Sequence, residues 1–390
     1  NASRTTVLNT TDSAVTFAGT LKNTTSNAEA LTITAGSGDV MFTGAVGASA
    51  VNGAIGALGI TNTGNVTFTN TVDTSSVSTA TGSTLRIKGG RVTTTWAQWY
   101  GGDVLLDNAL QSTTLNTTNS AVNFRGFVKN YAATPQSLTV NSGSGDVTFV
   151  GVAGVTGNAL GDVVINSEGV TTIQSTVDAA SLKTDVNGVD PVTLGGRIVI
   201  QGGRISTSGT GALTLGDINT GLTLTKDVWL TTAGGALHVG GWIEGADVGV
   251  NAQSLTLNAT SAGAVNVDGT VGVNTPLKTL TLTHSNGATF GDEVKTDISV
   301  MLTDTTATRD ITFVGDLTTA TLTTTGSGYN VKLLGAQTTV TNSTVFNHTG
   351  SLTLGDEATD ALSFAGGLTA TAPSRISAAG RISTANAAVT

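Results

Sequence analysis

Short stretches in which apolar and polar residues alternate recur along the whole chain. In each of them the first and third residues are apolar, as in Val15-Thr16-Phe17, Val40-Met41-Phe42 and Val66-Thr67-Phe68. Because successive side chains of a strand point to opposite faces, both apolar residues lie on one face and the middle residue lies on the other. The pattern predicts short, half-buried β-strands.

A glycine follows many of these strands at a fixed distance. The motif reads apolar, any residue, Phe or Val, any residue, Gly. It occurs at Val15/Phe17/Gly19, Val40/Phe42/Gly44, Val122/Phe124/Gly126, Val147/Phe149/Gly151, Leu237/Val239/Gly241, Val265/Val267/Gly269, Ile311/Phe313/Gly315 and Leu362/Phe364/Gly366. Glycine suits a corner, where the backbone takes a positive φ or approaches another segment closely. Each strand is therefore expected to end at a corner.

The strands return with a period of 26 or 27 residues. Two series show it: Leu31, Leu58 and Leu85 are 27 residues apart, and Val40, Val66 and Val92 are 26 apart. A string of immunoglobulin-like sandwiches also has short strands, but its strands need different, complementary patterns. One pattern repeated with little change is typical of stacked coils. We predict an all-β parallel β-helix (β-solenoid) with coils of about 26 residues. About 15 such coils, spaced by roughly 4.8 Å, would extend for about 70 Å.

A longer duplication lies over this period. Residues 6–17 recur as residues 113–124, at an offset of 107. Residues 88–92 correspond to residues 201–205 at an offset of 113, which predicts an insertion near residues 185–191. We divide the chain into a repeat unit at 1–110, a homologous unit at 111–220, and more divergent coils at 221–390 that end in a truncated repeat.

The ends of the chain carry no recognisable capping segment. Residues 383–390 match residues 10–16, the opening of a unit, and then stop. An open coil presents unpaired backbone groups to other chains. We therefore expect the open ends to continue into the same repeat array or to associate with another copy of the protein.

The amino-acid composition argues against several classes of function. The chain has 75 Thr and 51 Gly among 390 residues, and only 11% of its residues are charged. A net charge of −9 argues against binding to nucleic acid, which requires clustered Lys and Arg. The absence of Cys excludes disulfides and thiolate metal sites. The chain contains no run of about 18 apolar residues, so the sequence predicts no transmembrane helix.

The residues that most often carry chemistry are scattered. His238, His284 and His348 share no ligand spacing. The densest acidic groups are Asp292-Glu293 and Asp356-Glu357 with Asp360. Polysaccharide-cleaving β-helices use acidic clusters beside a basic residue on one face. Neither group recurs on successive coils with Lys or Arg, so we interpret both as turn residues. We predict no catalytic residue, no metal and no cofactor.

Trp96, Trp99 and Tyr100 form the only aromatic cluster in a chain with 4% aromatic residues. Exposed aromatic rings can stack on sugar rings or anchor a protein partner. Buried rings would only fill a wider coil. These three residues are the candidate contacts for a partner or a surface glycan.

Several segments resemble the strand repeats of very large bacterial surface proteins. They include Gly64-Asn65-Val66-Thr67-Phe68, Arg91-Val92-Thr93-Thr94-Thr95 and Gly350-Ser351-Leu352-Thr353-Leu354-Gly355-Asp356. These repeats are similar to those of filamentous-haemagglutinin-like adhesins and autotransporter passengers, and the similarity covers most of the chain. It implies a right-handed parallel β-helix that is exported to the bacterial surface or the extracellular matrix.

Together these features indicate a structural, non-catalytic solenoid segment. It would serve as a rigid stalk or as a fibre subunit that stacks end to end, in adhesion or biofilm. The alternative is a β-helix that binds glycans or cleaves polysaccharides.

Overall fold

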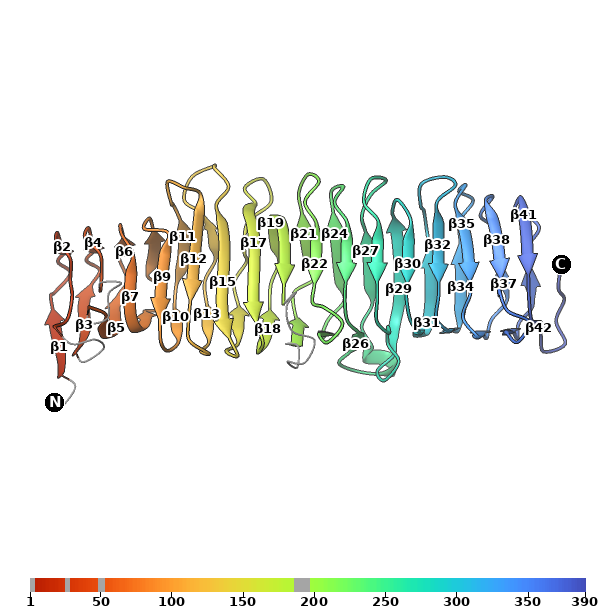
Figure 1. Ribbon diagram of the computed structural model, residues 1–390, viewed down its shortest axis with the longest axis horizontal. Helices are drawn as coiled ribbons and strands as arrows, with labels where there is room; N and C mark the ends of the chain where they lie inside the picture. Colours follow the sequence, from red (N-terminus) through yellow and green to blue (C-terminus); the bar gives the residue numbers. More distant parts are fainter. Residues whose placement is uncertain (1–3, 25–28, 48–52, 186–196) are drawn as a thin grey trace. The chain divides into compact units, whose positions relative to one another are not determined.

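The fold is an all-β parallel β-solenoid of about 15 turns, as predicted. The computed structural model describes residues 4–24, 29–47, 53–185 and 197–390. The chain forms two compact units, Asn1–Asn187 and Gly188–Thr390. Within each unit the strands of successive coils lie side by side (Figure 1) and pair in parallel, which a sandwich domain does not do. The insertion expected near residues 185–191 lies outside the described residues, apart from Asp185.

Unit 1 has three parallel ladders, one on each side of the coil. The first contains β1 (Arg4–Asn9), β3 (Glu29–Gly36), β5 (Ile55–Asn62), β7 (Val72–Thr79), β10 (Gln98–Tyr100), β13 (Val122–Phe124), β16 (Val147–Phe149) and β18 (Val170–Ile173). The second contains β2 (Val15–Phe17), β4 (Val40–Phe42), β6 (Asn65–Phe68), β8 (Thr84–Ile87), β11 (Asp103–Leu106) and β14 (Val128–Asn130). The third begins at β7 and adds β9 (Arg91–Thr94), β12 (Ser112–Asn116), β15 (Ser137–Gly143), β17 (Leu160–Ser167) and β19 (Val177–Thr184).

Unit 2 repeats this arrangement with three ladders of its own. One contains β20 (Arg197–Ile200), β23 (Gly221–Leu224), β26 (Ile243–Gly245), β31 (Val294–Leu302), β33 (Leu317–Thr319), β36 (Gln337–Val340), β39 (Ala361–Phe364) and β42 (Arg381–Ser383). Another contains β21 (Arg204–Thr207), β24 (Val228–Thr232), β27 (Leu255–Asn258), β29 (Leu277–His284), β31, β34 (Thr321–Thr324), β37 (Thr344–Val345) and β40 (Leu368–Thr369). The last contains β22 (Leu213–Leu215), β25 (Leu237–Val239), β28 (Val265–Val267), β30 (Ala288–Phe290), β32 (Asp310–Phe313), β35 (Asn330–Leu333), β38 (Ser351–Leu354) and β41 (Arg375–Ala378).

Helical structure is limited to one short 3-10 helix, η1 (Gly249–Asn251), in the residues that the structure describes. None of these residues belongs to a helix with the length and apolar character that crossing a membrane requires.

The interior is a stack of apolar side chains, as the alternating pattern predicts. Phe124 of β13 lies between Tyr100 and Phe149 of the neighbouring coils, with ring centroids 5.4 Å and 4.7 Å away. Phe17 and Phe42 stack in the same way at 4.9 Å. Each such ring is held between like rings because the parallel register places equivalent residues above one another.

The corner glycines are needed for close approach between coils. A Cβ on Gly151 would overlap the backbone of Gly126 in the preceding coil, and Gly44 stands in the same relation to Gly19. These four glycines are not among those with positive φ. Of the two reasons expected for glycine at these corners, only the close backbone approach applies.

Coils average about 24 residues, slightly fewer than the predicted value of about 26. The step from one coil to the next is not constant: Leu58 pairs with Val77 across a short coil, and Leu237 pairs with Val265 across a long one. Leu58 therefore does not align with Leu85, the residue that the sequence period assigns to it. Coil length varies because corners and loops differ in length while the strands keep their register.

The duplication does not span a whole number of turns. Val46 and Ala153 are equivalent residues, 107 positions apart, and each precedes a left-handed glycine: Gly47 has a φ of 77° and Gly154 a φ of 71°. Val46 joins the third ladder of unit 1, whereas Ala153 joins the second. Equivalent residues of the two copies therefore point to different sides of the solenoid.

Unit 2 contains a further copy of this feature. Val271 forms bridges to Ile243 and Val294, and Gly272 follows it with a φ of 69°. The long strand β31 then pairs through its first half with β33 and through its second half with β34. In unit 1, β7 pairs with β9 and β10 in the same way.

Strand pairing also runs across residues 110 and 220, so the sequence repeat boundaries are not structural breaks.

Polar side chains link successive coils. Asn141 Nδ2 donates to Asn116 Oδ1 and Asn166 Nδ2 donates to Asn141 Oδ1, each at 2.7 Å, which forms an asparagine ladder. At one corner the N–H of Ser37 donates to Asp12 Oδ1 at 2.7 Å, and this bond lowers the pKa of Asp12.

The same corner recurs in the second copy of the duplication with an amide in place of the carboxylate. Asn119 Oδ1 accepts a hydrogen bond from the N–H of Ser144 at 3.1 Å, as Asp12 does from Ser37. The corner therefore requires a side-chain oxygen that accepts a hydrogen bond, and this oxygen need not carry a negative charge. Several acidic residues of this chain serve as such acceptors: Asp39, Asp103, Asp146, Asp227 and Asp316 each accept a backbone N–H of the next coil.

Candidate functional site

The structure divides the predicted aromatic cluster between the interior and the surface. Trp96 is 66% exposed and Trp99 is 42% exposed, whereas Tyr100 is fully buried. The Tyr100 hydroxyl donates to Gln98 Oε1 at 2.8 Å, and Gln98 Nε2 donates to the carbonyl of Asn116 at 2.8 Å. Tyr100 is therefore a core residue and cannot contact a ligand, while the two tryptophans can.

Trp99 belongs to a larger surface that sequence reasoning did not identify. In this surface three exposed aromatic rings each lie next to a cation. Arg125 Cζ is 5.3 Å from the centroid of Trp99, Lys129 Nζ is 5.4 Å from that of Phe127, and Arg86 Cζ is 3.4 Å from that of Tyr131. We call these six residues the aromatic corner.

The register of the ladders assembles the aromatic corner. Arg86 of β8, Leu105 of β11 and Lys129 of β14 are paired neighbours on successive coils and point outward. Phe127 directly follows the corner glycine Gly126, which leaves its ring 43% exposed. Arg125, Phe127, Lys129 and Tyr131 lie within one stretch of seven residues, a signal present in the sequence that the sequence analysis did not use. Arg86 and Trp99 join them from other coils, and this could be known only from the strand register.

Two carboxylates lie within the aromatic corner. Asp103 Oδ2 is 3.2 Å from Lys129 Nζ, and Asp103 Oδ1 accepts the N–H of Phe127 at 3.0 Å. Asp107 forms an ion pair with Arg86. Among the described residues no carboxylate lies within ion-pair distance of Arg125, so this guanidinium contacts Trp99 without a counter-charge.

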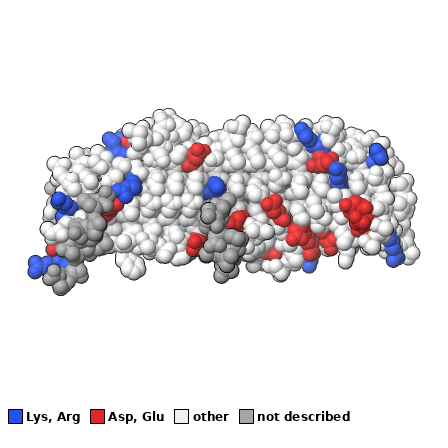
Figure 2. All heavy atoms as spheres, in the orientation of Figure 1, with Lys and Arg blue, Asp and Glu red and all other residues white. Residues whose placement is uncertain are grey.

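The charge of this region differs from that of the rest of the chain. Residues 84–131 contain five Lys and Arg and two Asp, which gives a local charge of +3 against −9 for the whole chain. In the view of Figure 2, Asp and Glu side chains gather over unit 2, and most of the visible surface is uncharged. The aromatic corner is thus a locally basic surface on an acidic protein.

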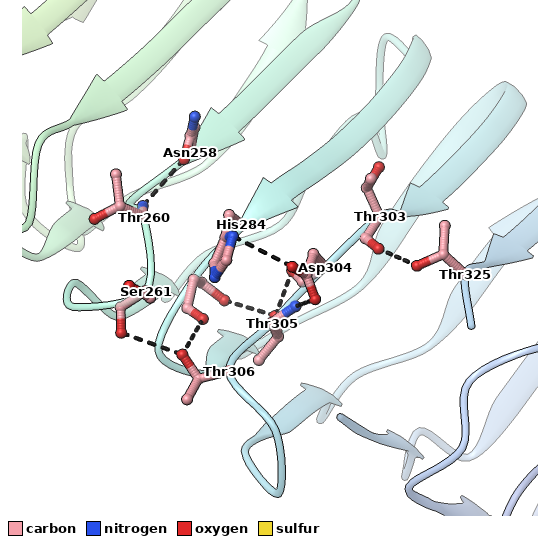
Figure 3. Close-up of polar contacts among 10 residues, drawn as sticks. Asn258, Thr260, Ser261, His284, Thr303, Asp304, Thr305, Thr306 and Thr325 are labelled. Carbon is pink, nitrogen blue, oxygen red and sulfur yellow. Dashed lines mark hydrogen bonds and ion pairs between the residues drawn. The ribbon is translucent and has the colours of Figure 1, made fainter. Parts of the chain in front are cut away.

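The two half-buried histidines, His238 and His284, each face a carboxylate on another coil. His238 Nε2 lies 2.7 Å from Asp268 Oδ2, and His284 Nδ1 lies 3.3 Å from Asp304 Oδ2. Both pairs connect neighbouring coils of unit 2. Figure 3 shows the second pair at the end of β29, where several Ser and Thr side chains meet.

The hydroxyls beside His284 bond to one another and to the backbone. Ser285 Oγ and Thr305 Oγ1 are 2.8 Å apart, and Thr306 Oγ1 donates to the carbonyls of Ser261 and Ser285 at 3.1 and 3.2 Å (Figure 3). A nucleophilic triad needs a hydroxyl hydrogen-bonded to the imidazole. The contacts here instead hold successive coils together.

His348 is a core residue. It is fully buried, and its ring stacks on Tyr329 with centroids 5.5 Å apart. Burial lowers the pKa of His348, because the apolar surroundings disfavour the charged imidazolium. The three histidines are therefore in three separate environments, and none shares a site with another.

The acidic groups named from the sequence lie in turns. Asp292 Oδ1 accepts the N–H of Glu293 at 2.8 Å. Asp360 is buried, and its Oδ2 accepts the N–H groups of Asp356 and Glu357 at 2.9 and 3.0 Å. No group of three or more His, Asp or Glu suited to a metal ion occurs in the described part of the chain.

Comparison with known proteins identifies no relative. No family model matches this chain, and neither a curated protein nor a solved structure matches it.

Proposed function

We propose that this protein is a rigid, non-catalytic structural segment of an exported bacterial surface or extracellular protein. The observation that carries the proposal is the uninterrupted parallel pairing of coils within each unit. Backbone ladders on three sides and a filled apolar interior resist bending, because any bend must break hydrogen bonds or open a cavity. Such a segment suits a stalk that holds other parts of a surface at a distance.

The location rests on the resemblance of the repeats to those of bacterial adhesins. A Thr- and Asn-rich exterior with few charges and no Cys fits a protein that gains rigidity from stacking and not from disulfides. We assign the segment a role in adhesion or biofilm on the same grounds.

The outermost strands provide the basis for association. Among the described strands, β1 pairs only with β3, and β41 pairs only with β38. A strand with one free edge accepts another strand. We propose that these edges pair with further coils of the same array or with a second copy of the chain.

Electron microscopy of negatively stained protein over a range of concentrations tests the proposal. A stalk segment should form straight rods of about 70 Å, as expected for about 15 coils spaced by roughly 4.8 Å. Stacking copies should form filaments that lengthen with concentration. Flexible or globular particles would contradict a rigid role.

A second assay tests the non-catalytic assignment. The protein is incubated with acidic polysaccharides, and their chain length is followed by size-exclusion chromatography. We expect no change. Shortening of the polysaccharide would show that the protein is a polysaccharide-cleaving β-helix.

A further inference from the structure

We propose that the aromatic corner of unit 1 binds an acidic polysaccharide whose sugar rings carry carboxylates. This binding function goes beyond the structural role and does not depend on it. The two proposals can therefore fail separately. A rigid segment that binds no glycan would overturn only the binding proposal, and a flexible segment that binds a glycan would overturn only the structural one.

The first argument is that large aromatic rings are exposed at surface positions where the fold does not require an aromatic residue. This fold buries its aromatic stack inside, yet Trp99 is 42% and Tyr131 is 51% exposed. Every cation–π contact of the described residues lies in the aromatic corner. Trp, Tyr and Arg are also the residue types enriched at binding hot spots.

The second argument is the match to sugar chemistry. The flat ring of Trp99 or Phe127 offers an apolar face to the C–H groups of a pyranose. Asp103 stands beside Phe127, and Asp107 pairs with Arg86, which lies over Tyr131; both present carboxylate oxygens that can accept hydroxyl protons. Trp99 lies on one coil, and Phe127 and Tyr131 flank β14 on the next, so a polymer that crosses these two coils would meet more than one ring.

The third argument is charge. Arg125 contacts Trp99 and has no counter-charge among the described residues, so a carboxylate on the sugar can supply one. Single-stranded nucleic acid also stacks on aromatic rings. Its binding depends on a groove of Lys and Arg that follows the phosphates, however, and here Lys129 and Arg86 are already paired with Asp103 and Asp107. A sugar polymer fits this surface better, because its hydroxyls can donate to these two carboxylates while its own carboxylate meets Arg125.

The test uses the full chain with polygalacturonate, and with the same polymer after complete methyl esterification, which removes only the charge. We expect polygalacturonate to bind at least about tenfold more tightly than its ester, equivalent to roughly 1.4 kcal/mol. Oligothymidylate and dextran sulfate serve as polyanions without the uronate. Binding is measured by biolayer interferometry, with the polysaccharide immobilised.

Variants separate the ring from the charge. Trp99→Ala should weaken binding to both forms of the polymer by about tenfold, since it removes the stacking face. Arg125→Gln should weaken binding to polygalacturonate alone and abolish the preference for it. The matched control is Trp229→Ala, because Trp229 of β24 is 47% exposed but lies outside the aromatic corner, and this change should leave binding unaltered. Circular dichroism verifies that each variant folds.

Three results would overturn the proposal. The first is equal binding, or no binding, of polygalacturonate and its methyl ester. The second is an equal loss with Trp99→Ala and Trp229→Ala. The third is binding of oligothymidylate or dextran sulfate as tight as that of polygalacturonate, which would indicate attraction by charge alone.

Discussion

The interior and the exterior of the solenoid differ most sharply at β10, where Trp99 and Tyr100 are neighbours in sequence. Tyr100 is fully buried, stacks on Phe124 and donates a hydrogen bond to Gln98. Trp99 points outward and contacts Arg125. One strand thus supplies a residue on which the fold depends and a residue that the fold does not need. The interior restricts what a position can hold, and the exterior leaves it open to specialisation.

The same lesson follows from comparing the corner at Phe127 with its counterpart in unit 2. Trp242 occupies the equivalent position, after the corner glycine Gly241, and Glu244 stands where unit 1 has Lys129. Glu244 is buried, and its carboxylate accepts the N–H of Thr275 at 2.7 Å. The strand geometry is retained while the charge is reversed, so the basic aromatic corner is a property of one copy and not of the repeat.

The largest expected effect comes from breaking the interior stack. Phe124→Ala should lower the free energy of unfolding by about 3–5 kcal/mol, because it leaves a cavity between two rings that the ladders hold apart. Phe127→Ala removes the same side chain from the surface and should cost less than about 1 kcal/mol. Urea denaturation measures both. Similar losses for the two variants would contradict the division between interior and exterior.

A smaller effect is expected from the polar part of the interior. Tyr100→Phe leaves Gln98 Oε1 buried without its donor, which should lower stability by about 1–3 kcal/mol. The control is Tyr131→Phe, since Tyr131 is exposed and its hydroxyl can be replaced by water. Its stability should change by no more than about 0.5 kcal/mol. A neutral Tyr100→Phe variant would mean that the buried hydrogen bond adds nothing to stability.

The same tyrosine makes stability fall at alkaline pH. Burial raises the pKa of Tyr100 far above the ordinary value near 10, and burial also raises the pKa of Tyr329. Below pH 10 both the folded and the unfolded chain keep these protons. Above pH 10 the unfolded chain loses these protons before the folded chain does, so stability should fall as the pH rises, by about 1.4 kcal/mol per pH unit for Tyr100.

Tyr100→Phe sharpens this prediction, because it removes one of the two groups and leaves Tyr329 in place. The decline of the unfolding free energy between pH 10 and pH 11, followed by urea denaturation, should become shallower. An unchanged slope would show that Tyr100 releases its proton in the folded state.

The smallest effect on stability should come from the exposed side of β10. Trp99→Ala is expected to change the free energy of unfolding by less than about 1 kcal/mol, because the side chain is 42% exposed and its ring contacts Arg125 at the surface. Thermal melts of this variant should superimpose closely on those of the parent chain. A loss as large as that of a core truncation would mean that the indole supports the fold and was not retained for binding.

The architecture followed from local patterns. Alternation in segments such as Val40-Met41-Phe42 predicted strands, and the glycine that follows predicted corners, since both depend on residues close in sequence. The duplication at an offset of 107 and the solenoid itself could be predicted because every coil repeats the same short-range rule. The turn roles of Asp292 and Asp360 were predicted for the same reason.

The tertiary structure alone decided which coils are neighbours. Leu58 pairs with Val77 and not with Leu85, because the coils differ in length while strand register is kept. Alternation along β10 puts Tyr100 and Trp99 on opposite faces, whereas the register brought Arg125 onto the indole. Amino-acid patterns therefore determined that this chain forms a solenoid. Contacts between residues about one coil apart depend on the summed lengths of the intervening corners, and only the folded stack sets those lengths.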